Sequence, residues 1–308
     1  MKNFSGKTET GFLIIDDTVV EKQGKPKKID GPGWHYSHTK GRAVYGHSIV
    51  TSHYRIGKIS FPYDFRFYLN EDVALKCNRE FKLKPEIACE LINEFKQIRS
   101  EKIYCLVDSW YTSEKVIKSA KSRDFKVIGA LKSNRVFQLK EHGEKHNLST
   151  YVKNLKNTSF ERVLFKDEVF KVRRIEACLK GIGKLAILIS VRVKDGSKMF
   201  ILITDLNLGI EEIMRYYSYR WDIETGYLYC KDRPGLGHYQ MRKLKAIEKY
   251  CTLVFAAYAL LESMRVSGNE QSLGKSRQYF KLMKKRKYVD QVIELYKKGV
   301  QKETSIKK

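Results

Sequence analysis

Two short apolar runs that each end in aspartate place the strongest constraint on the fold of this 308-residue chain. The first is Gly11-Phe-Leu-Ile-Ile15, which Asp16-Asp17-Thr18 follows, and the second is Ile103-Tyr-Cys-Leu-Val107, which Asp108 follows. Runs of this length without charged positions are typical of central strands that are buried on both faces. The pattern therefore predicts a covered sheet with carboxylates at the ends of two strands.

Further strands and helices around these runs give a mixed α/β pattern. From Ala43 to Leu69, aromatic, β-branched and polar residues alternate, which predicts two strands in a meander. Pro85 opens a segment of helical periodicity that extends to about Arg99, and Phe125 to Leu131 is typical of a fifth core strand. A polar, basic region follows, with β patterns at 162–165, 169–179, 185–193 and 199–204.

The stretch Tyr217-Ser-Tyr-Arg220-Trp-Asp-Ile-Glu224-Thr-Gly-Tyr-Leu-Tyr-Cys-Lys231 carries a phenol, two cations and a carboxylate at helical spacing. On one helix, with about 100° per residue, these four side chains would fall within roughly 60° of one another. A metal-binding carboxylate flanked by cations that grip phosphates is what cutting a phosphodiester requires. For any one residue, a solvated helix face with ion pairs is the simpler explanation, but the ordered set favours a site.

The spacing Tyr-x2-Arg-x3-Glu-x6-Lys resembles the signature of transposases of the insertion sequence 4 family, which use a DDE triad. The resemblance extends from about Gly11 to about Leu261. It implies an α/β fold of the ribonuclease H-like type, a mixed sheet flanked by helices, with a β-strand-rich insertion before the last catalytic helix. It also implies DNA transposition, in which element ends are cleaved and joined to target DNA by two-metal phosphoryl transfer.

The resemblance implies that Asp17, Asp108 and Glu224 are the catalytic and metal-binding acids. In the family, the first aspartate ends the first core strand and precedes Thr, which selects Asp17 over Asp16. Taken alone, the segment is an ordinary Asp-Thr turn or cap. The strands that carry the first two aspartates are neighbours in a ribonuclease H-like fold, so we expect the three carboxyl groups to lie roughly 4 to 8 Å apart.

The same resemblance implies two Mg²⁺ ions, for which Mn²⁺ can substitute, and phosphate contacts from Tyr217, Arg220 and Lys231. The expected partner is double-stranded DNA, both transposon ends and target, and a homodimer in the DNA complex is left open. The predicted organisation is a first part of the core at 9–132, a β-rich insertion at 133–206, a second part of the core at 207–266 and a basic, helical C-terminal tail at 267–308.

Charge and cysteine usage agree with a nucleic-acid partner in a reducing compartment. The formal net charge is +25, so a polyanion is expected. The apolar stretch from Tyr250 to Leu261 is too short to span a bilayer, and no membrane partner is expected. We expect it to lie in a helix from about Arg242 to Met264 whose face packs on the sheet through Leu253, Ala256, Ala257, Leu260 and Leu261. The six cysteines contain no CxxC pair, and no signal peptide precedes the first strand, which predicts a cytoplasmic protein.

Two other classes of protein were weighed against the enzyme. A non-catalytic, DNA-binding transposase remnant explains the charge, but the intact acids argue against decay. A generic RNA-binding protein leaves the acids unexplained. Only 16 residues precede Asp17, too few for the separate DNA-recognition domain that the family places there, so we expect a truncated transposase with salt-sensitive, sequence-indifferent DNA affinity.

Overall fold

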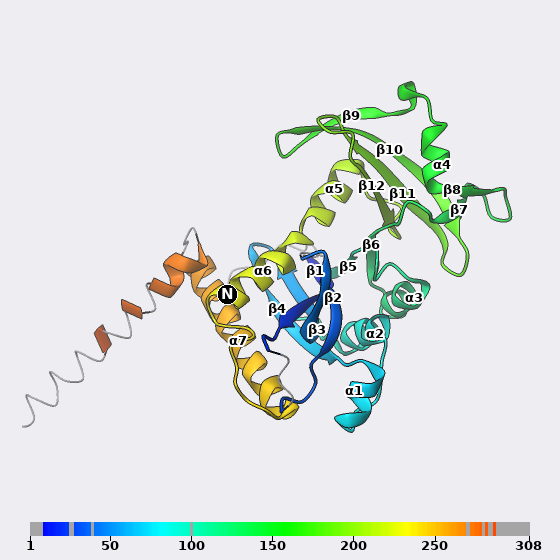
Figure 1. The fold of residues 1–308 in the computed structure, drawn as a ribbon. Coiled ribbons are helices and arrows are strands. Elements are labelled where there is room, and N and C mark those ends of the chain that lie inside the picture. The colour runs from blue at the N-terminus through cyan, green and yellow to red at the C-terminus, as the bar shows by residue number, and fades with distance from the viewer. Residues whose placement is uncertain are drawn as a thin grey trace, which may run out of the picture.

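The computed structural model describes residues 9–24, 28–37, 40–98, 101–268, 272–278, 281–282 and 286–287 (Figure 1). Most of the predicted basic tail, 267–308, therefore lies outside the described residues. In the part of the chain that is described, no helix combines the length and the apolar character needed to cross a bilayer.

The strands and helices alternate along the chain in a mixed α/β order. The strands are β1 (Thr10–Glu21), β2 (Gly33–Ser37), β3 (Arg42–Ile56), β4 (Ile59–Tyr68), β5 (Lys102–Val107), β6 (Lys126–Ala130), β7 (Val136–Gln138), β8 (Lys145–Asn147), β9 (Glu161–Phe165), β10 (Glu168–Leu179), β11 (Gly183–Arg192) and β12 (Lys198–Ile203). The helices are α1 (Glu71–Lys76), α2 (Lys84–Glu94), α3 (Glu114–Ser122), α4 (Leu148–Lys153), α5 (Ile210–Ser218), α6 (Trp221–Asp232) and α7 (Leu244–Ser267), with a 3₁₀ turn at Asn157–Ser159.

The core of the sheet has the strand order β4-β3-β1-β5-β6. The pairs β4–β3 and β3–β1 are antiparallel, whereas β1–β5 and β5–β6 are parallel. This arrangement agrees with the predicted ribonuclease H-like fold. Because β1 and β5 are parallel neighbours, with Ile15 opposite Val107, Asp16 in β1 lies level with Asp108, which follows β5. The prediction that the first strand ends at its aspartates is wrong, because Asp16 to Glu21 still pair with β3 and β1 continues to Glu21.

The strands of the predicted insertion extend the core sheet. β12 pairs antiparallel with β6, and β11 and β10 follow in the same sheet, so that the described residues form one sheet of twelve strands. The pairing satisfies the backbone groups of β6, which would otherwise be an open edge. The boundaries 133–206 stay a prediction, but the strands β9 to β12 continue the core away from β1 (Figure 1).

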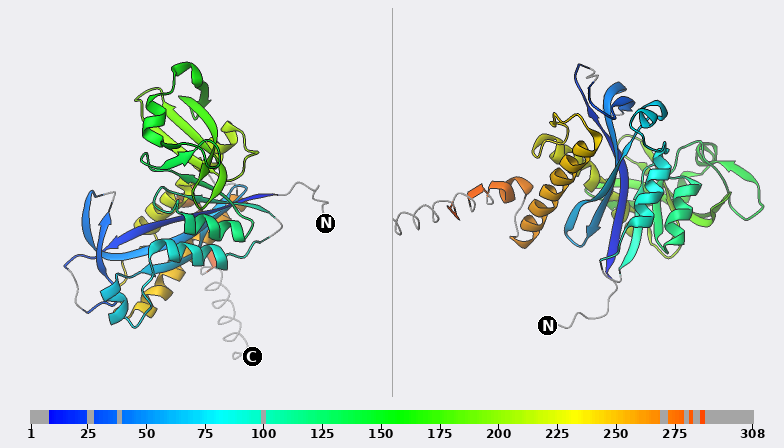
Figure 2. Two further views of the ribbon diagram at one scale, coloured as in Figure 1. Left: turned by 90° about the vertical axis from the view of Figure 1, so that its right-hand side faces the viewer. Right: turned by 90° about the horizontal axis from the view of Figure 1, so that it is seen from below.

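Helices cover both faces of the sheet, as the buried runs predict. On one face, α2 and α3 pack on Leu13, Ile15 and Val107. On the other face, α5 and α6 pack on Phe12 and Ile14, and α7 lies on the same side, against β4 (Figure 2). Since successive side chains of a strand point to opposite faces, neighbouring residues of β1 meet different helices.

The sequence does not predict correctly which face of α7 packs on the sheet. Leu253 and Leu260 were expected to pack on the sheet, but their side chains are 70% and 52% exposed. The buried face instead carries Leu244, Ile247, Cys251, Val254, Phe255 and Tyr258. The helix is apolar almost all round, so its periodicity does not select a face, and the aromatic pairing of Phe255 with Phe65 of β4 does.

Candidate active site

Asp16 and Asp17 follow each other in β1, and the pleat of the strand sends their side chains to opposite faces. Asp16 lies on the face of Phe12 and Ile14, toward α5 and α6. Asp17 lies on the face of Ile15, toward α2 and α3. The two carboxylates therefore have different partners, although they are adjacent in the sequence.

Asp16 lies at the centre of the candidate site. Its carboxylate accepts hydrogen bonds from the backbone N–H of Asp17 at 2.8 Å and from Arg220 Nη1 at 3.2 Å. Burial and, next, repulsion from the Asp108 carboxylate raise the pKa of Asp16 to about 7, even though the Arg220 charge opposes the shift. A carboxyl group with a neighbouring acid and a pKa near neutrality is a typical functional group.

Asp108 ends β5, as predicted, and the turn after it holds its side chain. The carboxylate accepts the backbone N–H groups of Trp110 at 2.8 Å and Tyr111 at 3.0 Å, while the Thr112 hydroxyl donates to its carbonyl. Ser113 caps the next helix, α3, because its hydroxyl accepts the N–H of Val116. These bonds fix the Asp108 carboxylate beside Asp16.

The predicted signature helix is divided into α5 and α6. Around Tyr219 and Arg220 the backbone keeps helical dihedral angles, but its hydrogen bonds are of the i→i−3 type, from Tyr219 to Tyr216 and from Arg220 to Tyr217. This tightened turn separates Tyr217, on α5, from Glu224, on α6. Arg220 lies at the junction and reaches Asp16 in the middle of β1.

Arg220 joins the sheet to α6. Its guanidinium pairs with Asp16 at 3.2 Å and with Glu224 at 2.7 Å, and its side chain is only 14% exposed. The Tyr217 ring centroid lies 6.0 Å from the guanidinium carbon, and burial raises the pKa of this phenol to about 12. Tyr217, Arg220 and Glu224 therefore lie beside Asp16, although two helices and not one carry them.

Two predicted site residues lie apart from this group. The Asp17 carboxylate pairs with Lys84 Nζ at 2.6 Å and accepts the Tyr111 hydroxyl at 2.8 Å, on the opposite face of β1. Lys231 Nζ donates to the Thr18 hydroxyl at 2.7 Å and to the Val19 carbonyl at 3.0 Å, and burial lowers its pKa. Lys231 thus binds β1 beyond the acids. The geometry offers Asp16, and not Asp17, as the first acid.

The acids do not form a ready-made metal cage in the described residues, where no group of three or more His, Cys, Asp or Glu side chains is placed to hold an ion. The bridging guanidinium explains this, because it satisfies Asp16 and Glu224 with charge of the same sign as a metal. The donor set itself fits Mg²⁺, which prefers carboxylate oxygens. A cation beside Asp16 and Asp108 would also relieve the repulsion that raises the Asp16 pKa.

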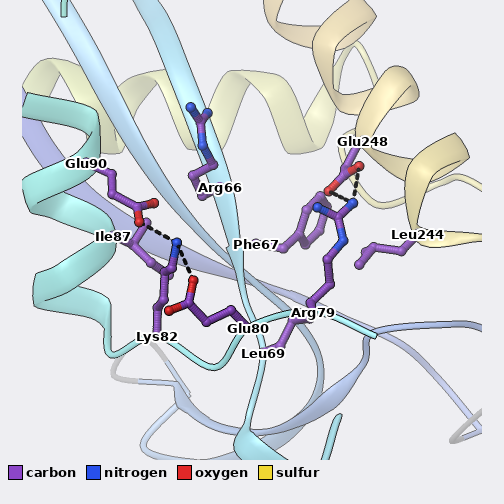
Figure 3. Close-up of a pocket in the computed structure, with 10 residues that line it drawn as sticks. All are labelled: Arg66, Phe67, Leu69, Arg79, Glu80, Lys82, Ile87, Glu90, Leu244 and Glu248. Atoms are coloured by element: carbon purple, nitrogen blue, oxygen red, sulfur yellow. Dashed lines mark hydrogen bonds and ion pairs between the residues drawn. The ribbon is translucent and has the colours of Figure 1, made fainter. Parts of the chain in front are cut away.

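A hollow of about 300 Å³ between β4, α2 and α7 contains none of these acids (Figure 3). Its charged side chains neutralise one another: Lys82 pairs with Glu80 at 3.0 Å and with Glu90 at 2.6 Å, and Arg79 pairs with Glu248 at 3.2 Å. Each of these acids is therefore paired with a cation, and none is left facing only another acid. This hollow is therefore a weaker candidate than the edge of the sheet at Asp16.

Sequence profiles of known families match the segments that build this edge. The profile described as "Transposase DDE domain" matches residues 82–260, more than half of the chain. This chain belongs to the DDE transposase family. A second profile, described as "DDE superfamily endonuclease", matches residues 4–148. Together the two matched regions of this DDE transposase contain Asp16, Asp108 and Glu224.

Two other comparisons add little to the family assignment. A search of curated proteins finds no match to this DDE transposase. Among solved structures, it is similar to the NurA nuclease from Sulfolobus solfataricus, with 10% sequence identity, a TM-score of 0.30, and coverage of 84% of this chain and 83% of that chain. A score this low carries no argument about function.

Sequence reasoning missed the roles of Lys84 and Tyr111, which bind Asp17 from 67 and 94 residues away. No local pattern signals such contacts. A signal for Asp16 exists once the register of β1 against β5 is known, with Ile15 opposite Val107. Asp16 alternates along β1 to the same face as Phe12 and Ile14, and Asp108 falls on the same face as Leu106. Because these apolar residues pack in one cluster, the same face of the sheet carries both acids.

Proposed function

We propose that this DDE transposase cleaves DNA and transfers strands in the manner of the insertion sequence 4 family, with Asp16, Asp108 and Glu224 as its metal-binding acids. One observation supports this assignment most strongly. Arg220 pairs with Asp16, from which it is 204 residues away in the sequence, and with Glu224, beside the end of β5 where Asp108 lies. Asp16 and Glu224, from two separate elements, thus share one cation, and Asp108 lies close enough to Asp16 to repel its charge, an arrangement that a merely structural ion pair does not require.

Each residue of the group has a definite task in this proposal. Two bound Mg²⁺ ions would activate the attacking water or 3′-hydroxyl and stabilise the leaving oxygen. Asp16 and Glu224 would hold the ions with Arg220 displaced from them, together with Asp108, which the backbone N–H groups of its turn orient. Because Asp16 has a pKa of about 7, it must also release its proton near neutral pH before it serves as a ligand.

The cations and the phenol bind the DNA backbone. When DNA binds, Arg220 leaves the carboxylates of Asp16 and Glu224 and contacts a phosphate, to which its planar guanidinium can donate two hydrogen bonds. Tyr217 places its hydroxyl beside Arg220. Lys231 must give up its bonds to Thr18 and Val19 to reach a phosphate, so its contact requires DNA to be present. Holding the backbone still favours the in-line attack.

The proposal is tested by Mg²⁺-dependent nicking of supercoiled DNA, with Glu224→Gln as the matched variant. The substitution removes one ligand and no cation, so nicking should fall at least 1000-fold while the dissociation constant for DNA stays within about twofold. Nicking that persists in Glu224→Gln would exclude this acid from catalysis. Normal binding with no nicking by the unsubstituted protein would favour a non-catalytic DNA-binding protein.

A further inference from the structure

Asp17 forms a second polar cluster behind the candidate site. Its side chain is 18% exposed and lies between Lys84 Nζ of α2, at 2.6 Å, and the Tyr111 hydroxyl, at 2.8 Å. Lys84 is 19% exposed, so the pair is well shielded from water. Asp17 thus directs a neutralised carboxylate at Tyr111 and away from Asp16.

Tyr111 connects this cluster to the second acid. Its ring is fully buried in the core beneath α2 and α3, and its hydroxyl donates to Asp17. Its backbone N–H donates to Asp108 Oδ1 at 3.0 Å, beside the N–H of Trp110 at 2.8 Å. One residue therefore touches Asp17 with its side chain and Asp108 with its main chain.

The link is stiff. A tyrosine has only two side-chain torsions, and a fully buried ring in a close-packed core is held in one rotamer. If the hydroxyl is fixed at Asp17, the backbone of the turn is fixed as well, and so are the two N–H groups that orient the Asp108 carboxylate. Metal ligands held by such outer contacts bind more tightly than ligands that are free to rotate.

We infer that Asp17 is a positioning residue, which anchors the Tyr111 hydroxyl and thereby fixes the turn that aims Asp108 at the metal. The inference rests on the proposed function, since it assumes that Asp108 is a ligand. It differs from the expectation that Asp17 is itself a ligand. In that case, Asp17 would have to leave Lys84 and Tyr111 and turn through the plane of the sheet.

The pair of variants Tyr111→Phe and Asp17→Ala separates these two roles. Tyr111→Phe removes only a hydroxyl and leaves every carboxylate in place. Tyr104→Phe is the matched control, because Tyr104 is also buried and also donates to an aspartate, Asp205, at 2.7 Å, but has no bond to the turn after β5. Each protein is measured for DNA affinity and, in the presence of saturating duplex DNA, which releases Arg220 from the acids, for Mn²⁺ affinity by titration calorimetry.

We expect Tyr111→Phe to weaken Mn²⁺ binding by about threefold to tenfold, with DNA affinity within twofold, and Tyr104→Phe to leave both unchanged. Asp17→Ala should weaken Mn²⁺ binding to a similar degree. The double variant should lose no more than the single variants, because both act through one hydrogen bond. Loss of Mn²⁺ binding in Asp17→Ala alone, with Tyr111→Phe unaffected, would overturn the positioning role and make Asp17 a ligand.

A metal-free measurement keeps this test independent of the proposed function. Amide hydrogen exchange at Trp110 and Tyr111 reports on the two N–H groups that hold Asp108. Exchange should accelerate at least fivefold in Tyr111→Phe and in Asp17→Ala, but not in Tyr104→Phe. Unchanged exchange would overturn the inference, even in a protein that binds metal normally. If the unsubstituted protein binds no Mn²⁺ even with saturating duplex DNA, the proposed function fails, whatever the exchange rates are.

Discussion

Arg220 lies between Asp16 and Glu224, with guanidinium nitrogens 3.2 Å and 2.7 Å from their carboxylate oxygens. The contact joins the middle of β1 to the start of α6 and places one positive charge between two acids. In the DNA-free protein, this arginine therefore neutralises the groups that the proposed function assigns to metal. Release of Arg220 to a DNA phosphate would free both acids at the moment when substrate arrives.

Replacement of Arg220 by Ala tests this exchange. The variant loses one phosphate contact, so the slope of log affinity against log salt should fall by about 1. Arg79→Ala is the control, because Arg79 pairs with Glu248 in the hollow between β4 and α7, where none of the three acids lies. Equal losses of slope in the two variants would show that Arg220 holds DNA no differently from a remote surface cation.

Asp16 should make the metal-free protein less stable at alkaline pH. Burial and Asp108 raise its pKa from 3.8 to about 7, so the folded state favours the protonated form. Its favourable contribution is complete below about pH 4 and is lost as the pH rises through about 7. Asp16→Asn should therefore be more stable than the unsubstituted protein at pH 8, on the order of a few kcal/mol.

The stability difference is measured by urea unfolding in the presence of a chelator, at pH 4 and at pH 8. The advantage of Asp16→Asn should shrink toward zero at the lower pH. The neighbouring Asp17→Asn supplies the comparison, because Asp17 is already neutralised by Lys84. An advantage of Asp16→Asn that does not depend on pH would show that the Asp16 carboxyl group is not responsible.

Because α7 packs through Phe255 and not through Leu253, replacing these two side chains by alanine should have unequal effects on stability. Phe255 is buried against Phe65, whereas Leu253 is 70% exposed. Phe255→Ala should cost about 3 to 5 kcal/mol of stability, and Leu253→Ala no more than about 0.5 kcal/mol. Chemical denaturation of both variants measures this. Similar losses would mean that Leu253 packs against the protein, as the sequence first suggested.

The sequence predicted the features of the fold that depend on local patterns. The runs Gly11–Ile15 and Ile103–Val107 are buried strands, and Asp108 ends the second of them. The helix opened by Pro85 also forms, although it ends at Glu94, before the predicted Arg99, since Phe95 is already extended. Apolar runs, prolines and caps are short-range signals, and tertiary packing does not override them here.

Features that depend on contacts between distant elements were not predictable in the same way. The choice between Asp16 and Asp17 depends on which face of β1 receives α5 and α6, and one sequence does not specify that face. The division of 217–231 into two helices depends on a tightened turn at Arg220 that a periodicity of 3.6 does not reveal. Strand parity does group Asp16 with Asp108, once the pairing of β1 with β5 is known.

The most direct test of the central claim compares DNA nicking by Asp16→Asn and Asp17→Asn in saturating Mg²⁺. Asparagine keeps the size of each side chain, and at position 17 it still offers an oxygen to the Tyr111 hydroxyl. We predict that Asp16→Asn loses nicking at least 1000-fold with DNA binding intact, while Asp17→Asn nicks within about tenfold of the unsubstituted protein. Full activity in Asp16→Asn together with loss of activity in Asp17→Asn would contradict the assignment of Asp16 as the first catalytic acid.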